Sequence, residues 1–188
     1  MLIAISGGIG AGKSIVARIV DKLGFRVYDT DTKAKTMMHT DASIRERLRQ
    51  EFGDEIVGEQ GVDRALLSSI VFNDQKKLKL LNSIVHNAVL QDVENWHNAA
   101  NGVSFVETAL LYQSGMDKVV DRVWMVEAPK ELRIERVMKR NGLSREEVMS
   151  RIRSQHFVAE EVHQNEKIII NDDKTPLLPQ IFGLLKRL

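Results

Sequence analysis

The sequence predicts an α/β fold with a parallel sheet flanked by helices. Three observations support this: short apolar runs without alternation, helical patterns between those runs, and a glycine-rich turn directly after the first run. Apolar runs of this kind are typical of parallel strands, because helices cover both faces of the sheet. Four clear runs predict strands at 2–6, 103–106, 123–126 and 168–170. A weaker run predicts a fifth strand at 26–29.

The stretch between the second and third predicted strands is far longer than a simple crossover requires. Within it, Leu81, Val85, Val89 and Val93 recur every fourth residue, which places them on one face of a helix. A shorter helical pattern covers 66–71, and we see no convincing strand. We therefore expect residues 29–97 to form a helical insertion into the core.

A second excursion from the core is predicted after Arg140. Ser144 is followed three residues later by Glu147, which is the pattern of a capping box at the start of a helix. The helix that begins there is highly charged, which suits a mobile lid better than a packed core. We expect a short helical lid over 140–161, and a core formed by 1–28 with 98–139 and 162–188.

The turn after the first strand fits the phosphate-binding pattern GxxxxGK(S/T) over Gly7–Ser14, and the helix expected over Lys13–Lys22 follows it. Glycines let the backbone N–H groups point inward as an anion nest, and the helix N-terminus adds positive potential. The motif therefore predicts a P-loop NTPase core that binds ATP, with Lys13 on the β- and γ-phosphates and Ser14 as a ligand of Mg²⁺. The expected ATP-binding residues of this segment are Gly8, Gly10, Ala11, Gly12, Lys13, Ser14 and Ile15.

Two carboxylates, Asp29 and Asp31, follow the second predicted strand. In open α/β sheets, ligands bind at the carboxyl ends of the strands. A carboxylate there can orient an acceptor hydroxyl and take its proton as the bond to phosphorus forms. Asp31 alternatively caps the helix that follows it, and spacing alone leaves these two roles open.

Polar residues on predicted helices and strand ends add further candidates. Asn82 and His86 are four residues apart and share a helix face, where His86 is either a substrate contact or a half-buried structural histidine. Glu107 follows the third predicted strand, where it either holds Mg²⁺ through water or is structural.

Three arginines, Arg133, Arg136 and Arg140, share one helix face. Arginine presents a planar fork to phosphate, which suits the charge that develops during phosphoryl transfer. The face is alternatively a solvated surface paired with Glu131 and Glu135. We favour Arg140 as the catalytic arginine that contacts ATP, because it lies at the hinge into the predicted lid.

The order and spacing of several segments resemble the dephospho-coenzyme A kinase family. The resemblance implies ATP-dependent phosphorylation of the ribose 3′-hydroxyl of dephospho-CoA, the last step of coenzyme A biosynthesis. It also implies Asp31 as the base, 29–97 as the CoA-side domain, and Asp29, Asn82 and His86 as substrate contacts. The segments that carry it are 7–14, 27–35, 81–86, 106–113, 136–144, 151–155 and 170–172. Departures from the family pattern are Ile15, Lys35, Asn87, Glu107, Ala109 and Gln113.

Charge, cysteine content and the segment 171–174 argue against several other classes of protein. The net charge is +1 with both signs interspersed, which argues against a nucleic-acid surface and so against a DNA-binding ATPase. There is no cysteine, which excludes disulfides and thiolate metal sites and fits the cytoplasmic location that we expect. Segment 171–174 reads Asn-Asp-Asp-Lys, which does not fit the guanine motif of a GTPase. Another P-loop small-molecule kinase, for nucleosides or nucleotides, is the main alternative.

Overall fold

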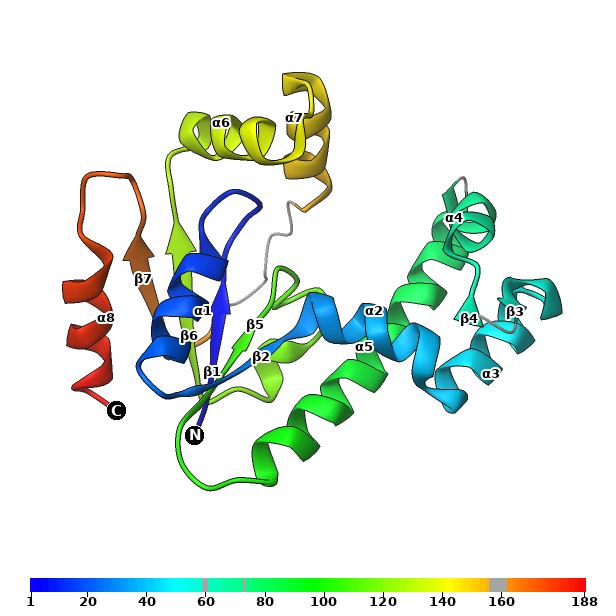
Figure 1. Ribbon diagram of the computed structural model, residues 1–188, viewed down its shortest axis with the longest axis horizontal. Helices are drawn as coiled ribbons and strands as arrows, with labels where there is room; N and C mark the ends of the chain where they lie inside the picture. Colours follow the sequence, from blue (N-terminus) through cyan, green and yellow to red (C-terminus); the bar gives the residue numbers. More distant parts are fainter. Residues whose placement is uncertain (59–60, 73, 156–161) are drawn as a thin grey trace. The chain divides into compact units, whose positions relative to one another are not determined.

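The computed structural model describes residues 1–58, 61–72, 74–155 and 162–188 (Figure 1). The chain divides into two compact units, one formed by Met1–Tyr28 with Ala100–Leu188 and the other by Asp29–Ala99. The last residues of the predicted lid, 156–161, lie outside the described residues.

The first unit is built on a five-stranded sheet in the order β2-β5-β1-β6-β7. The pairs β1–β5, β1–β6 and β6–β7 are parallel. All five strands predicted from the sequence are present, as β1 (Leu2–Ser6), β2 (Arg26–Asp29), β5 (Ser104–Glu107), β6 (Arg122–Glu127) and β7 (Glu166–Ile170). Because β1 is central and fully buried, the turn that follows it emerges at the middle of the carboxyl edge of the sheet.

Helices α1 (Lys13–Lys22) and α8 (Leu177–Leu185) pack on each other and on this sheet. The bounds of α1 are those expected from the sequence. In the apolar core of this unit, the ring centroids of Phe105 and Trp124 lie 4.9 Å apart. The ring of Phe25 packs edge to face on Phe105, with 5.4 Å between the centroids. This apolar core holds β1 and α1 in place, and with them the turn that joins the two.

Helices α6 (Lys130–Asn141) and α7 (Arg145–Ser154) form a pair beyond the carboxyl ends of the strands (Figure 1). The pair has its own small core of Ile134, Val137 and Val148. The predicted capping box is present: the Glu147 amide donates to Ser144 Oγ at 3.2 Å, and the Ser144 amide donates to Glu147 Oε2 at 2.7 Å. A 3₁₀ turn, η2 (Met116–Lys118), lies between β5 and β6.

The second unit is mainly helical and has a separate core that includes Ile44, Leu48, Ile56, Leu67 and Ile84. A two-stranded antiparallel sheet of β3 and β4 interrupts the helices. The expectation that this stretch holds no strand was wrong, because strands of two residues show no alternation to detect. The elements are α2 (Thr30–Thr40), α3 (Ala42–Phe52), η1 (Asp54–Ile56), β3 (Val57–Gly58), β4 (Gly61–Val62), α4 (Arg64–Phe72) and α5 (Gln75–Asn98).

Candidate active site

The segment Gly7–Ser14 forms the turn between β1 and α1. Gly12 is the N-terminal cap of α1 and has a φ of 98°, which lies in the left-handed region that favours glycine. A Cβ at this position would also overlap the side-chain amide of Asn171. That amide is buried and donates to the Ala11 carbonyl at 2.8 Å. Asn171, which follows β7, therefore stabilises the turn although it lies 160 positions away in the sequence.

The two polar residues that open α1 already have partners. Lys13 Nζ donates to the Gly7 carbonyl at 2.9 Å, which folds the lysine back over the turn. Ser14 Oγ donates to Glu107 Oε1 at 2.7 Å, and Glu107 is the last residue of β5. The structure thus brings a hydroxyl and a carboxylate together at the carboxyl edge of the sheet. Oxygen ligands of this kind fit Mg²⁺.

Two arginines of α6 contact the turn. Arg133 Nε donates to the Ile9 carbonyl at 2.9 Å, and Arg136 donates to the Gly10 carbonyl at 3.4 Å. Burial lowers the pKa of Arg133 from its ordinary value, yet a guanidinium stays charged in proteins. The Arg133 guanidinium lies close against Gly8, so a Cβ at this position would displace the end of the arginine side chain. These contacts place two positive charges beside the phosphate-binding turn.

Arg140, the arginine favoured from the sequence, lies at the exposed carboxyl end of α6 and donates to Asn141 Oδ1 at 2.9 Å. Within the part of the chain that the structure describes, the arginine contacts to the turn come from Arg133 and Arg136. Helical spacing placed all three arginines on one face of α6. It does not show which turn of that helix contacts the phosphate-binding loop.

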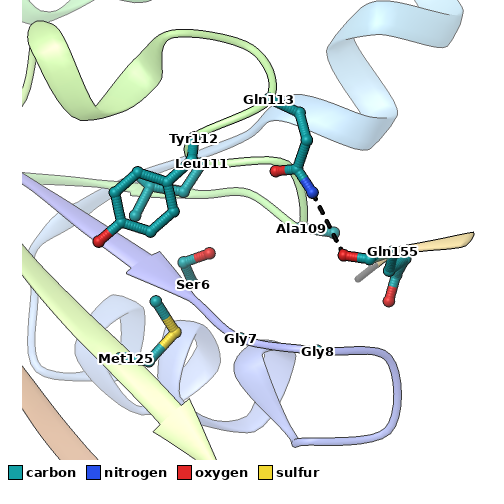
Figure 2. Close-up of a pocket in the computed structure, with 9 residues that line it drawn as sticks. All are labelled: Ser6, Gly7, Gly8, Ala109, Leu111, Tyr112, Gln113, Met125 and Gln155. Atoms are coloured by element: carbon teal, nitrogen blue, oxygen red, sulfur yellow. Dashed lines mark hydrogen bonds between the residues drawn. The ribbon is translucent and has the colours of Figure 1, made fainter. Parts of the chain in front are cut away.

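A pocket of about 180 Å³ lies beside the start of the turn (Figure 2). Gln113 Nε2 donates to the Gln155 carbonyl at 3.3 Å across its rim. The side chain of Gln155 turns to the loop, where its Oε1 accepts from the Ile9 amide at 2.8 Å. Sequence reasoning did not single out Gln155, because the two partners are 146 positions apart. The lining residues are Ser6, Gly7, Gly8, Ala109, Leu111, Tyr112, Gln113, Met125 and Gln155.

A second hollow, of about 570 Å³, lies on the segment that joins β7 to α8. Its wall includes Asn171, the residue that braces the turn at Ala11. Three of its other lining residues are polar or charged: Asp173, Lys174 and Thr175. The remaining ones are apolar: Pro176, Leu177, Leu178 and Pro179.

The two carboxylates after β2 have different surroundings. Asp29 is the N-terminal cap of α2: one of its oxygens accepts from the Thr32 amide at 3.1 Å and the other from the Thr32 hydroxyl at 2.7 Å. The alternative that Asp31 caps this helix was therefore wrong. The reason is that α2 begins at Thr30, immediately after the strand, so the cap falls two residues earlier. Asp31 is an exposed residue of the first turn, where the helix dipole favours negative charge.

Asn82 and His86 lie one turn apart on α5. Asn82 is exposed and His86 is half-buried. Burial lowers the pKa of His86 from its ordinary value, because desolvation disfavours the imidazolium. In the neutral ring, one nitrogen accepts a hydrogen bond and the other donates one.

Residues 1–58, 61–72, 74–155 and 162–188 contain no group of three or more histidine or acidic side chains with the geometry of a metal site. In the same described ranges, every helix is too short or too polar to cross a membrane.

A parallel sheet, a GxxxxGKS turn at the head of α1 and arginines that contact this turn define a P-loop kinase. The family model described as dephospho-CoA kinase matches residues 1–176. The chain therefore belongs to the dephospho-CoA kinase family.

Individual relatives agree with this membership. A dephospho-CoA kinase from Bacteroides fragilis is 36% identical over 185 residues, which cover 97% of this chain and 90% of the relative. A crystal structure from Thermus thermophilus superimposes with a TM-score of 0.78 at 33% identity, covering 100% of this chain and 95% of that one. A dephospho-CoA kinase from Campylobacter jejuni shares the fold, with a TM-score of 0.68 at 24% identity and coverage of 99% and 96%.

Proposed function

We propose that this protein transfers the terminal phosphoryl group of ATP to the ribose 3′-hydroxyl of dephospho-CoA, giving coenzyme A and ADP. The observation that carries the proposal is the family match over residues 1–176, which includes an intact phosphate-binding turn. We also propose a cytoplasmic location for this reaction, as expected from a chain without cysteine.

In this proposal the turn Gly8–Ile15 binds the phosphates of ATP. Its backbone N–H groups and the N-terminus of α1 supply donors and positive potential. Lys13, which now rests on the Gly7 carbonyl, would extend to the β- and γ-phosphates. Arg133 and Arg136 add charge beside the turn, and Arg140 is assigned to ATP from the end of α6.

The hollow on residues 171–179 is a suitable place for the base of the nucleotide. It adjoins the turn through Asn171, which contacts Ala11. Pro176, Leu177 and Pro179 offer apolar surface for a flat ring, while polar groups nearby can read its edge.

A magnesium ion belongs to the proposed reaction, and Ser14 with Glu107 would hold it. A hydroxyl and a carboxylate 2.7 Å apart match the preference of Mg²⁺ for a few protein oxygens together with phosphate oxygens. When bound, the ion neutralises charge on the β- and γ-phosphates.

The acceptor side of the proposal lies in residues 29–97. Asp31 accepts the proton of the attacking hydroxyl as the new O–P bond forms and the bond to the β-phosphate oxygen of ADP breaks. Asp29, Asn82 and His86 are assigned to acceptor binding, with Asp29 also acting as the cap of α2. Residues 140–161 are assigned to a lid.

The direct test is to incubate the protein with ATP, Mg²⁺ and an acceptor panel of dephospho-CoA, nucleoside monophosphates and shikimate. With dephospho-CoA, mass spectrometry should show one added phosphate, and fragmentation should place it on the ribose. Turnover of a nucleoside monophosphate without turnover of dephospho-CoA would assign the protein to another kinase activity. The Lys13→Ala variant is the matched control for contaminating kinases.

A further inference from the structure

We propose that Gln155 is a phosphate-binding residue that exchanges its hydrogen-bonding role. Without nucleotide, its side-chain oxygen accepts from the loop amide of Ile9; with nucleotide, its side-chain N–H donates to a phosphate oxygen. The inference rests on the proposed function, since it requires ATP in the turn.

Ile9 lies within Gly7–Ser14, and its N–H donates to Gln155 Oε1 at 2.8 Å. This amide belongs to the set of donors with which such a turn binds anions. A phosphate oxygen is a charged acceptor and a carboxamide oxygen is neutral, so the phosphate forms the stronger hydrogen bond with the same amide. Bound nucleotide would therefore displace the Gln155 oxygen.

The backbone of Gln155 is held by Gln113 Nε2, which donates to its carbonyl at 3.3 Å (Figure 2). Gln155 also lines the pocket that includes Gly7 and Gly8. With its backbone fixed there, the side chain remains beside the turn after it has left the Ile9 amide.

Glutamine carries both an acceptor oxygen and an NH₂ with two donors. A rotation of about 180° at the end of the side chain replaces one by the other. Glutamine can thus satisfy the loop amide in the free protein and a phosphate oxygen in the complex. Glutamate can only accept, and alanine can do neither.

A purely structural role for Gln155 predicts something different. The residue also ends α7 as its C-terminal cap, so its contact with Ile9 could serve only to fasten α7 to the loop. A glutamate would keep that fastening, since a carboxylate accepts from an amide at least as well as a carboxamide does. On the structural view Gln155→Glu therefore unfolds like the wild type, and Gln155→Ala, which frees the Ile9 amide, binds ATP at least as well as the wild type. On our proposal both variants bind ATP more weakly than the wild type, and Gln155→Glu is the weaker of the two.

The test compares Gln155→Glu, Gln155→Ala and a charge-matched control, Ser154→Glu, which adds the same charge at an exposed neighbouring position. Affinity for Mg·ATP is measured by calorimetry without acceptor, and thermal unfolding is measured without nucleotide. We expect Gln155→Ala to bind ATP more weakly than the wild type. Gln155→Glu should bind at least about tenfold more weakly than Gln155→Ala, because its carboxylate competes for the Ile9 amide and repels phosphate.

The midpoint of unfolding of nucleotide-free Gln155→Glu should stay within about 2 °C of the wild type, since the fastening to Ile9 is kept. Ser154→Glu should bind ATP within about threefold of the wild type. The proposal is overturned if Gln155→Glu binds ATP as well as Gln155→Ala or better. It is also overturned if Gln155→Ala binds ATP as tightly as the wild type or more tightly, which would show that Gln155 does not donate to the phosphates. Wild-type turnover of dephospho-CoA is measured separately, so a failure of the proposed activity is distinguished from a failure of this role.

Discussion

At the scale of single residues, the phosphate-binding turn is held by contacts that a nucleotide would replace. The Lys13 ammonium donates to the Gly7 carbonyl, and the Ser14 hydroxyl donates to Glu107. The Ile9 amide donates to the side chain of Gln155. The main chain supplies most of the donors of the turn, and glycine allows its backbone angles. Binding then exchanges neutral or internal partners for charged phosphate oxygens, which limits the conformational cost of binding.

Lys13→Ala should remove nearly all turnover. One positioned positive charge on the transferring phosphoryl group is worth several kcal/mol in the transition state, comparable with the loss of an oxyanion-hole donor. We expect kcat to fall by about 10² or more, with only a small change in thermal stability, because the Lys13 side chain is not part of the buried apolar core. Steady-state kinetics at saturating ATP checks this, and a kcat within about tenfold of the wild type would show that the turn is not the catalytic cradle.

Asp31→Asn should separate catalysis from stability. Since Asp29, not Asp31, caps α2, the substitution leaves the cap in place and the free energy of unfolding should change by less than about 0.5 kcal/mol. If Asp31 is the base, kcat at saturating substrates should fall by about 10² or more.

Asp29→Ala is the matched comparison. It removes the acceptor of both Thr32 hydrogen bonds and should cost about 1 kcal/mol of unfolding free energy. Near-normal kcat in Asp31→Asn, together with a large loss of kcat in Asp29→Asn, would move the role of base to Asp29.

His86 should make the protein less stable in mild acid. Burial lowers its pKa in the folded state, so below the unfolded value of about 6.5 the unfolded chain binds the proton more readily than the folded chain. Stability should therefore fall as the pH drops from about 7 through the lowered pKa, and His86→Gln should weaken this dependence. Urea unfolding of both proteins at several pH values checks the difference, and identical pH profiles would remove His86 as its source.

At the scale of elements, local signals were sufficient for much of the fold. The five strands appear as apolar runs because helices cover the sheet, and α1 follows directly from the glycine turn. The capping box of α7 was readable because its two members are three residues apart. Each of these predictions depends on neighbours in the chain, which is the information that sequence spacing contains.

Features that depend on long-range packing could not be read in this way. The contact of Gln155 with Ile9 and that of Asn171 with Ala11 join residues 146 and 160 positions apart. The cap of α2 falls on Asp29 because the helix begins at the end of the strand, and the sequence leaves that boundary open by two residues. The short strands β3 and β4 are visible only through their pairing.

Ser144→Ala should loosen the start of α7 while leaving the rest of the protein intact. The substitution removes the hydroxyl that accepts from the Glu147 amide, a loss that typically costs about 1 kcal/mol. Since Val148 is the buried residue of this helix, the sheet core is unaffected. Hydrogen exchange should become faster over residues 146–148, with a small change in the midpoint of unfolding. Ser154→Ala, at the other end of α7, is the control, and unchanged exchange in Ser144→Ala would contradict the role of the box.

At the scale of the whole molecule, the chain passes between two units that have separate cores. It leaves the first unit after Tyr28 and returns at Ala100. The groups proposed to bind the donor, from Gly8–Ile15 to Asn171, belong to the first unit, and those proposed to bind the acceptor, from Asp29 to His86, belong to the second. Because each unit has an apolar core of its own, we expect each to hold the binding residues of its own substrate in place.

Each substrate alone should therefore protect a different unit from hydrogen exchange. ATP with Mg²⁺ should slow exchange in the turn 7–14, at the start of α1 and around Asn171, and leave α5 nearly unchanged. Dephospho-CoA alone should slow exchange on α2 and on α5 around His86, because a bound ligand lowers the population of open states where it makes contacts.

Lys13→Ala supplies the control for this experiment. It should weaken the protection by ATP and keep the protection by dephospho-CoA, because Lys13 belongs to the first unit, where its ammonium group donates to the Gly7 carbonyl of the turn. Protection of α5 by ATP alone, or of the turn 7–14 by dephospho-CoA alone, would show that the donor and acceptor sites are assigned to the wrong units. Because exchange is read segment by segment, that result would also identify which residues bind each substrate.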